Sequence, residues 1–155
     1  TNVYPNNMST TNTFAVGGDN GVNGNGDTYV SYCWAEIPGY SSFGSWVGNG
    51  SADGSFTETG FRPAMIFYKR INNNDSWGIH DNKRDIDNPI QRFLYPYHTY
   101  AEWTGGTNDH FDFLSNGFKA RNTGSMIGAD GGIYVYWAFA EQPFITPFGA
   151  SSNAR

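Results

Sequence analysis

Turn signals rich in glycine and asparagine interrupt the chain at short intervals and leave little room for helices. The clearest of these signals are GGDNGVNGNGD (17–27), GNGSADG (48–54), NNND (72–75), TGGTND (104–109) and SNG (115–117). Glycine and asparagine tolerate the backbone angles that tight turns need, so such clusters mark the ends of secondary-structure elements. The runs between them are rich in Tyr, Phe, Trp, Val and Thr, which fit a pleated sheet. The pattern therefore predicts many short strands.

The amino-acid composition also favours strands over helices. Of the 155 residues, 17% are aromatic and 20 are glycine, whereas only Leu94 and Leu114 are leucine. We expect an all-β fold, an antiparallel β-sandwich with a jelly-roll-like arrangement. One helical turn is predicted at 88–95, where Asn88 would be the cap and Pro89 the first helical residue. The predicted strands are Thr11–Val16, Thr28–Glu36, Phe43–Val47, Ser55–Thr59, Ala64–Arg70, Ser76–His80, Phe111–Leu114, Phe118–Arg121 and Gly132–Glu141.

One segment of the chain occurs twice. Residues 26–38 read GDTYVSYCWAEIP, and residues 131–143 read GGIYVYWAFAEQP, with six identical positions. Both copies are apolar on both faces, which is typical of central buried strands. We therefore expect two interior strands. Residues 1–38 would be the end of a preceding repeat, or a strand that pairs pseudo-symmetrically with the last one, packed on a main sandwich of residues 39–155.

The single cysteine, Cys33, lies inside the first copy and aligns with Ala138 in the second. One cysteine cannot form a disulfide within the chain. No neighbouring residue would activate it as a catalytic thiol. We therefore expect Cys33 to be a small buried core residue, because a free cysteine packs as a small hydrophobe.

The charge of the chain argues against two classes of partner. The net charge is -5, and the nine Lys and Arg residues are scattered. Nucleic acids and anionic membrane surfaces both attract clusters of basic residues, so the sequence predicts neither partner. No apolar run approaches the roughly 20 residues that span a bilayer, so no membrane insertion is expected. The chain also opens without a charged and apolar leader, which predicts no signal peptide in it.

A set of motifs runs through the chain in a fixed order. The set comprises GNGSADG (48–54), TGFRP (59–63), a strand that ends in Lys-Arg, SWGIHDNKRD (76–85) and FDFLSNGFKAR (111–121). It resembles a β-rich domain found in tail-fibre and other virion proteins of tailed bacteriophages, often in tandem copies. The resemblance covers about residues 26–155 and implies a place on the virion surface, with other virion subunits as partners. Because such fibres are commonly trimeric, it also implies a homotrimer. The segment YPYHTYAEW (95–103) departs from the family pattern and would be its variable part.

The sequence contains no strong signal for catalysis or metal binding. The loops 19–27 and 48–54 offer Asp and Asn oxygens, but neither has the spacing of a calcium loop, so we interpret them as tight turns. Asp109 and Asp112 have no clear second carboxylate placed across a cleft for glycoside hydrolysis. No Ser-His-Asp order, metalloprotease motif or phosphate-binding loop occurs. We expect no enzymatic activity, no cofactor and no metal.

Two groups of side chains are candidates for a role. The segment 95–103 would present flat rings to a sugar or a protein, the alternative being that half of the rings fold back as a satellite core. Charged residues around the hairpin at 70–76 would tie two strands together, the alternative being a catalytic base at Asp81. The candidate binding residues are Tyr95, Tyr97, His98, Tyr100 and Trp103. The candidate ion-pair residues are Lys69, Arg70, Asp81 and Arg84, with Asp85 beside them.

These features together predict a non-enzymatic virion surface domain. It would adhere to a glycan or protein of the host surface, or serve structural display. One alternative is a capsid decoration or subunit-packing domain, in which the aromatic segment would face a neighbouring subunit. A second alternative is a carbohydrate-binding module attached to an enzyme.

Overall fold

The computed structural model describes residues 10, 12–104, 106 and 110–141. The chain forms two compact units, Thr1–Trp34 and Ala35–Arg155, whereas the sequence placed the boundary after residue 38. In the first unit the described residues are irregular apart from one short helix, α1 (Asn20–Asn23), which the Asp19 carboxylate caps by accepting from the Gly21 N–H at 2.8 Å. Within the described ranges, no helix has the length and apolar character needed to cross a membrane.

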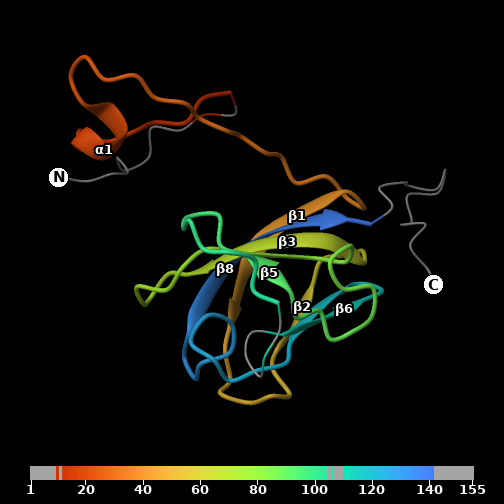
Figure 1. The fold of residues 1–155 in the computed structure, drawn as a ribbon. Helices are drawn as coiled ribbons and strands as arrows, with labels where there is room; N and C mark the ends of the chain where they lie inside the picture. The colour runs from red at the N-terminus through yellow and green to blue at the C-terminus, as the bar shows by residue number, and fades with distance from the viewer. Residues whose placement is uncertain (1–9, 11, 105, 107–109, 142–155) are drawn as a thin grey trace. The chain divides into compact units, whose positions relative to one another are not determined.

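The second unit is an all-β sandwich of two antiparallel sheets, which confirms the predicted fold class (Figure 1). The larger sheet has five strands, in the order β1 (Ser41–Val47), β8 (Ile133–Ala140), β3 (Pro63–Arg70), β4 (Gly78–Asp81) and β5 (Phe93–Leu94). The smaller sheet has three, in the order β2 (Phe56–Glu58), β7 (Gly117–Ala120) and β6 (Phe111–Leu114). These strands confirm seven of the nine predicted ones, with ends shifted by a few residues.

An aromatic core joins the two sheets. Trp46 of β1 is 5% exposed, and its ring stacks on Tyr134 of β8 with 4.7 Å between the ring centroids. The same ring meets Phe118 of β7 edge-on at 5.4 Å and Phe111 of β6 at 5.9 Å. The indole N–H donates to the carbonyl of Ile127 at 3.0 Å, so the polar edge of the ring is satisfied as well. Trp46 therefore contacts both layers of the sandwich.

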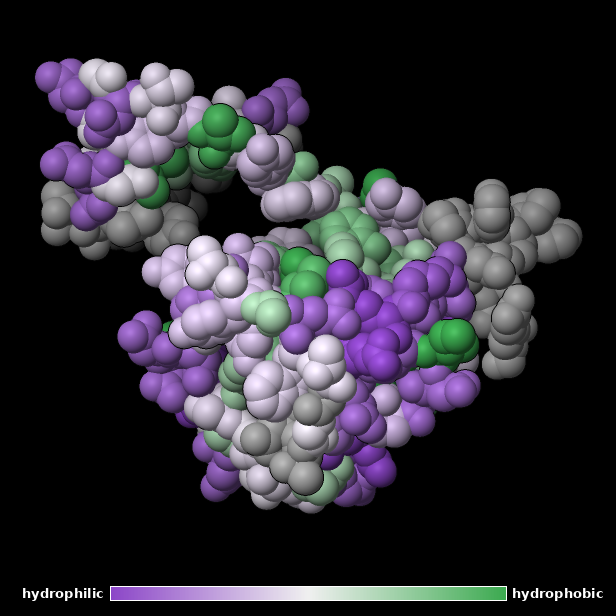
Figure 2. All heavy atoms as spheres, viewed as in Figure 1, coloured by the Kyte–Doolittle hydropathy of each residue, from purple (hydrophilic) through white to green (hydrophobic). Residues whose placement is uncertain are grey.

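The outward face of the larger sheet also carries aromatic residues. Phe43 lies opposite Trp137, and Trp137 lies opposite Phe67 with 5.2 Å between the ring centroids. All three side chains are half-buried. In Figure 2, apolar residues interrupt a largely hydrophilic surface of the second unit, in the region where Figure 1 places β1 and β3. An apolar outward face of this kind is a candidate contact surface.

The two predicted strands of the N-terminal region are wrong. The described residues of Thr11–Val16 and all of Thr28–Glu36 are irregular. Residues 28–36 are exposed, Val30 at 77%, and Cys33 is exposed instead of buried in a core. The second copy of the repeat, in contrast, is the interior strand β8, with β1 on one side and β3 on the other. The apolar pattern shows that a segment can form a strand, but a strand also needs partner strands.

The helical turn predicted at 88–95 is wrong as well. Phe93 and Leu94 form β5, and Ile90 makes a bridge to Phe111 of β6. Asn88 does not cap a helix; its side-chain amide accepts from the Phe113 N–H at 2.9 Å and donates to the Phe113 carbonyl at 3.0 Å. Ile90 and Phe93 are fully buried, so burial against the two sheets outweighs the local helix signal.

Substitution of Gly117 by alanine is expected to destabilise the smaller sheet. A Cβ at this position would lie 2.1 Å from the backbone oxygen of Thr57 in the neighbouring strand β2, and backbone atoms cannot move aside cheaply. We expect the free energy of unfolding to fall by about 1–3 kcal/mol in urea denaturation. Gly18→Ala is the control, because a Cβ there meets no atom within 4 Å. Equal stability of the two variants would refute the close packing of β2 against β7.

Candidate functional site

The aromatic segment 95–103 follows β5, the edge strand of the larger sheet, and its members differ in exposure. Tyr97 is 73% exposed and Tyr100 65% exposed. Tyr95 and His98 are half-buried. The segment is thus neither a strand with alternate residues hidden nor a fully exposed loop.

His98 lies at the centre of a cluster of rings. Its imidazole stacks on Tyr100 with 4.4 Å between the ring centroids and meets Tyr97 edge-on at 5.0 Å and Tyr95 at 6.0 Å. The backbone N–H of His98 donates to the Tyr95 carbonyl at 3.1 Å and closes a turn. The structure therefore brings four of the five candidate binding residues together.

Trp103, the fifth candidate, has a different surrounding. Its backbone exchanges two hydrogen bonds with Phe93, at 3.0 and 3.2 Å, so it extends the sheet beyond β5. Its ring centroid lies 6.2 Å from that of Phe93. Trp103 thus holds the end of the aromatic segment in place and does not line the pocket described next.

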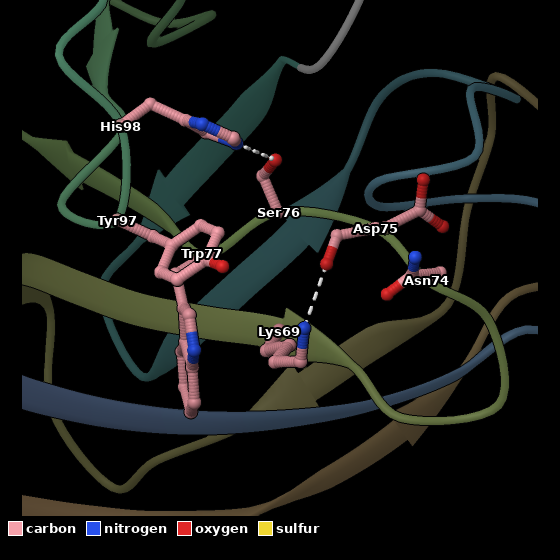
Figure 3. A pocket seen from close by; sticks show the side chains of 7 residues that line it. All are labelled: Lys69, Asn74, Asp75, Ser76, Trp77, Tyr97 and His98. Carbon is pink, nitrogen blue, oxygen red and sulfur yellow. Dashed lines mark hydrogen bonds between the residues drawn. The ribbon is translucent and has the colours of Figure 1, made fainter.

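Tyr97 and His98 form one wall of a pocket, and the hairpin between β3 and β4 forms the other (Figure 3). The cavity has a volume of about 410 Å³. Of the hairpin wall, which contributes most of the lining, the sequence singled out only Lys69, and that as an ion-pair residue. The lining residues are Lys69, Asn74, Asp75, Ser76, Trp77, Tyr97 and His98.

A hydrogen bond of 2.7 Å between Ser76 Oγ and His98 Nε2 joins the two walls of the pocket. On the hairpin side, the Lys69 ammonium donates to the backbone carbonyl of Asp75 at 2.7 Å. It also lies 5.6 Å from the centroid of the Trp77 ring, in a cation–π position. These contacts fix the shape of the pocket without filling it.

The pocket presents one fixed ring and one exposed ring. Trp77 stacks on Phe67 with 4.8 Å between the ring centroids and an interplanar angle of 13°, and it lies 5.2 Å from Trp137. It is therefore anchored on the outward aromatic face of the sheet. Tyr97, in contrast, exposes most of its ring. Figure 3 shows both side chains at the pocket, with His98 and Ser76 above them.

The carboxylate of Asp75 and the side-chain amide of Asn74, both in the hairpin wall, differ in how far they are already hydrogen-bonded. The Asp75 carboxylate accepts from the Ser125 hydroxyl at 2.7 Å and lies 3.5 Å from the Arg70 guanidinium. The side-chain amide of Asn74 makes no hydrogen bond with any residue in the described part of the chain. Asn74 can therefore donate to and accept from a ligand without giving up an existing bond.

The predicted ion-pair residues separate into two groups at opposite ends of β3. Lys69 and Arg70 contact Asp75 beside the pocket. Asp81 lies opposite Met65, near the other end of the strand, where it pairs with Arg84. Asp85 belongs to neither group; its carboxylate accepts from the backbone N–H groups of Gln91 and Arg92.

Arg84 connects its group to the aromatic segment, because its guanidinium also binds the carboxylate of Glu102 at 3.0 Å. Partial burial acts to lower the pKa of Arg84, but the hydrogen bond that Arg84 donates to Glu102 and the charge of Asp81 outweigh it, and the pKa is raised. Arg84 consequently stays protonated at any ordinary pH, so its own titration gives this contact no pH dependence.

We expect Arg84→Met to loosen the aromatic segment. The substitution keeps much of the apolar stem and removes both ion pairs, which are partly exposed, so the free energy of unfolding should fall by only about 1 kcal/mol. Hydrogen exchange of the amides in 95–103 should become faster. Arg92→Met is the control. It also removes an ion pair, the one with Asp85 at 3.6 Å, but at a side chain that is 50% exposed. Unchanged exchange in Arg84→Met would show that the ion pairs do not order the segment.

The GNGSADG loop is a tight turn held by the protein's own cations. The Asp53 carboxylate binds Lys119 at 2.6 Å and Arg121 at 3.1 Å. The hydrogen bond and charge of Lys119 lower the pKa of Asp53, so its pairing is lost only as the pH falls through that lowered value. Across the described residues, no group of three or more His, Cys, Asp and Glu side chains could hold a metal ion.

The pocket combines a serine–histidine pair with groups that can bind a polar ligand. Ser76 and His98 lie at the distance of a nucleophile and its base, but such a pair also needs a group that orients the second ring nitrogen of His98. No described residue makes a hydrogen bond to that nitrogen. Two aromatic faces, an ammonium and an unused amide are instead the groups that recognise a polar ligand with apolar faces.

Comparison with known proteins gives one match. A family model described as a domain of unknown function (DUF7483) matches residues 1–143, a range that includes every residue of the pocket. No curated protein sequence and no solved structure is significantly similar to the chain. The description of the family assigns no activity, so a function has to be argued from the site.

Proposed function

Because the chain belongs to the DUF7483 family, whose description names no activity, we propose a function from its pocket and its ordered motifs. The chain is a non-enzymatic surface domain of a phage virion, of the tail-fibre type, and it adheres to the host by binding a saccharide. The virion setting rests on the resemblance of the motif set. The saccharide rests on the pocket between the β3–β4 hairpin and the aromatic segment.

The pocket offers the two kinds of contact that sugars make with proteins. The rings of Trp77 and Tyr97 present flat faces on which the C–H groups of a sugar ring can stack. The Asn74 amide and the Lys69 ammonium present hydrogen-bonding groups to the hydroxyls. A volume of about 410 Å³ has room for one or two sugar units. These features support an adhesion role over plain display.

The single observation that carries the proposal is the exposure of Tyr97. Tyr97 is 73% exposed and lies at one wall of a pocket whose other wall is fixed, so its ring buries little area against the protein itself. Tyr and Trp side chains in such positions provide large, rigid contact areas at low entropic cost. A partner that covers the ring would therefore bury apolar surface, which lowers the free energy.

An array of bacterial surface glycans tests the proposal with the full chain. We expect retention of a small, related set of glycans, and we expect free oligosaccharide of the same structure to compete for binding. Absence of retention on the whole array would contradict the saccharide proposal. The same oligosaccharides, incubated with the chain and analysed by mass spectrometry, should remain intact; their cleavage would contradict the non-enzymatic part.

A second candidate function is subunit packing in the virion shell, and the outward aromatic face of the larger sheet favours it. Phe43, Phe67 and Trp137 are only half-buried there and form a continuous row across three strands. In that case the face would pack against a neighbouring subunit. The homotrimer that the family resemblance implies would be one arrangement of such subunits. The position of the chain in an assembled particle distinguishes the two functions, because an adhesin lies at a fibre and a packing domain lies in the shell.

A further inference from the structure

Residues 28–36 have the sequence of a strand but no sheet. They repeat the pattern of β8, which lies between β1 and β3 in the larger sheet. Yet every residue of the segment is exposed, with Val30 at 77%, Tyr32 at 76% and Trp34 at 58%. An exposed apolar run of strand-forming residues pairs readily with an open sheet edge.

The backbone of this segment has no partners either. Within the described part of the chain, no backbone hydrogen bond involves residues 30–34. The residue before this run, Tyr29, is held through its side chain: its hydroxyl donates to the Asn20 carbonyl at 2.5 Å and accepts from the Gly24 N–H at 2.7 Å. Residues 30–34 thus combine mostly apolar side chains with backbone N–H and C=O groups that bond to no described residue.

Strand β1 has an edge to which such a segment could add. It is the outermost strand of its sheet, and β8 pairs with only one of its sides. On the other side, the backbone of Ser41 bonds to Ile37. Because backbone groups of a strand alternate in direction, those of Phe43 and Ser45 point to this same side. No described residue makes a hydrogen bond with them.

We propose that residues 30–33 of one copy of the chain add as an antiparallel strand to the open edge of β1 in a second copy, next to the part of that edge that Ile37 already occupies. The register follows that of β8, in which Val135 lies opposite Ser45 and Trp137 opposite Phe43. The matching residues of the first copy of the repeat are Val30 and Tyr32. Tyr32 thereby joins the outward aromatic face beside Phe43.

The register explains why the acceptor is a second copy. The bridge between Ile37 and Ser41 fixes the turn that leads into β1. A strand that folded back through this turn would place Cys33 opposite Ser45 and Glu36 opposite Ser42. That register moves every side chain to the other face of the sheet and turns the Glu36 carboxylate toward the core beside Ser42, which is 6% exposed. A second copy is not bound by the turn, and each copy offers both a donor and an acceptor.

Disulfide trapping tests the register. In a hydrogen-bonded antiparallel pair the Cα atoms are about 5.5 Å apart, which a disulfide can span. Val30→Cys with Ser45→Cys, in a Cys33→Ser background, should give a disulfide between chains on a non-reducing gel. Ser45→Cys with the native Cys33 reports the fold-back register and should give no disulfide within the chain. Absence of the bond between chains in the first variant, or formation of the bond within the chain in the second, would overturn the proposal.

Sedimentation of the otherwise native chain tests the contact without a covalent trap. Val30→Pro removes an N–H that bonds to Ser45 of the second copy, and we expect self-association to weaken at least about tenfold. Ser31→Pro is the matched control, because its N–H points away from the acceptor edge, and we expect a change within about twofold. Both positions lie in an exposed irregular segment, so neither variant disturbs the sandwich. A native chain that stays monomeric, or equal effects of the two prolines, would contradict the proposal.

Discussion

Replacement of Trp46 by alanine is expected to lower the free energy of unfolding by about 4 kcal/mol, a large share of the total for a domain of this size. The indole is almost fully buried and contacts both sheets, through Tyr134 on one side and Phe118 on the other. Its removal leaves a cavity at the centre of the core and frees the Ile127 carbonyl from its hydrogen bond. Urea denaturation monitored by circular dichroism measures the change.

Trp34→Ala is the matched control for this experiment. Trp34 is 58% exposed and lies outside the sandwich core, so its removal should change the free energy of unfolding by no more than about 0.5 kcal/mol. Similar stability losses in the two variants would show that Trp46 is not the residue that joins the two sheets.

Replacement of Tyr97 by alanine is expected to lower the affinity for the saccharide by at least about 30-fold, which corresponds to about 2 kcal/mol. The ring is the exposed aromatic surface of the pocket, whereas Trp77 is already packed on Phe67. Because Tyr97 is 73% exposed, its removal should leave the melting temperature nearly unchanged. Isothermal titration with the monovalent oligosaccharide that scores highest on the glycan array measures the affinity.

Two further variants separate ring stacking from other effects of this substitution. Tyr97→Phe keeps the ring and should retain most of the affinity, because it loses only the hydroxyl. Tyr32→Ala removes an equally exposed tyrosine outside the pocket and should bind the oligosaccharide as the native chain does. Weakening in Tyr32→Ala, or full affinity in Tyr97→Ala, would place the saccharide elsewhere.

The sequence predicted most of the sandwich because most of its strands carry their own signals. The run from Ala64 to Arg70 begins with five consecutive apolar or aromatic residues and is followed by a turn signal, and it forms nearly all of β3 in the structure. The segment 28–36 has an equally good pattern but is irregular. Local pattern reports what a segment can form, and only the rest of the molecule decides whether a partner strand is available. The same limit applies to β5, where burial of Phe93 overrides the helix signal of Asn88 and Pro89.

The candidate site was half predictable for a similar reason. The density of rings in 95–103 is visible in the sequence, and it identified Tyr97 and His98. The opposite wall is not visible, because Asn74, Ser76 and Trp77 read only as a turn and the start of a strand. These residues meet Tyr97 through the folding of β3, β4 and β5 into one sheet, which places segments distant in sequence side by side.

The most direct test of the saccharide site is a nuclear magnetic resonance titration of the ¹⁵N-labelled chain with the selected oligosaccharide. The indole N–H signals report on individual tryptophans across the molecule. We predict that the signal of Trp77 and the ring signals of His98 shift with added sugar, because both side chains line the pocket, and that the signals of Trp46 and Trp34 do not. An unchanged Trp77 signal in the presence of bound oligosaccharide would contradict the account.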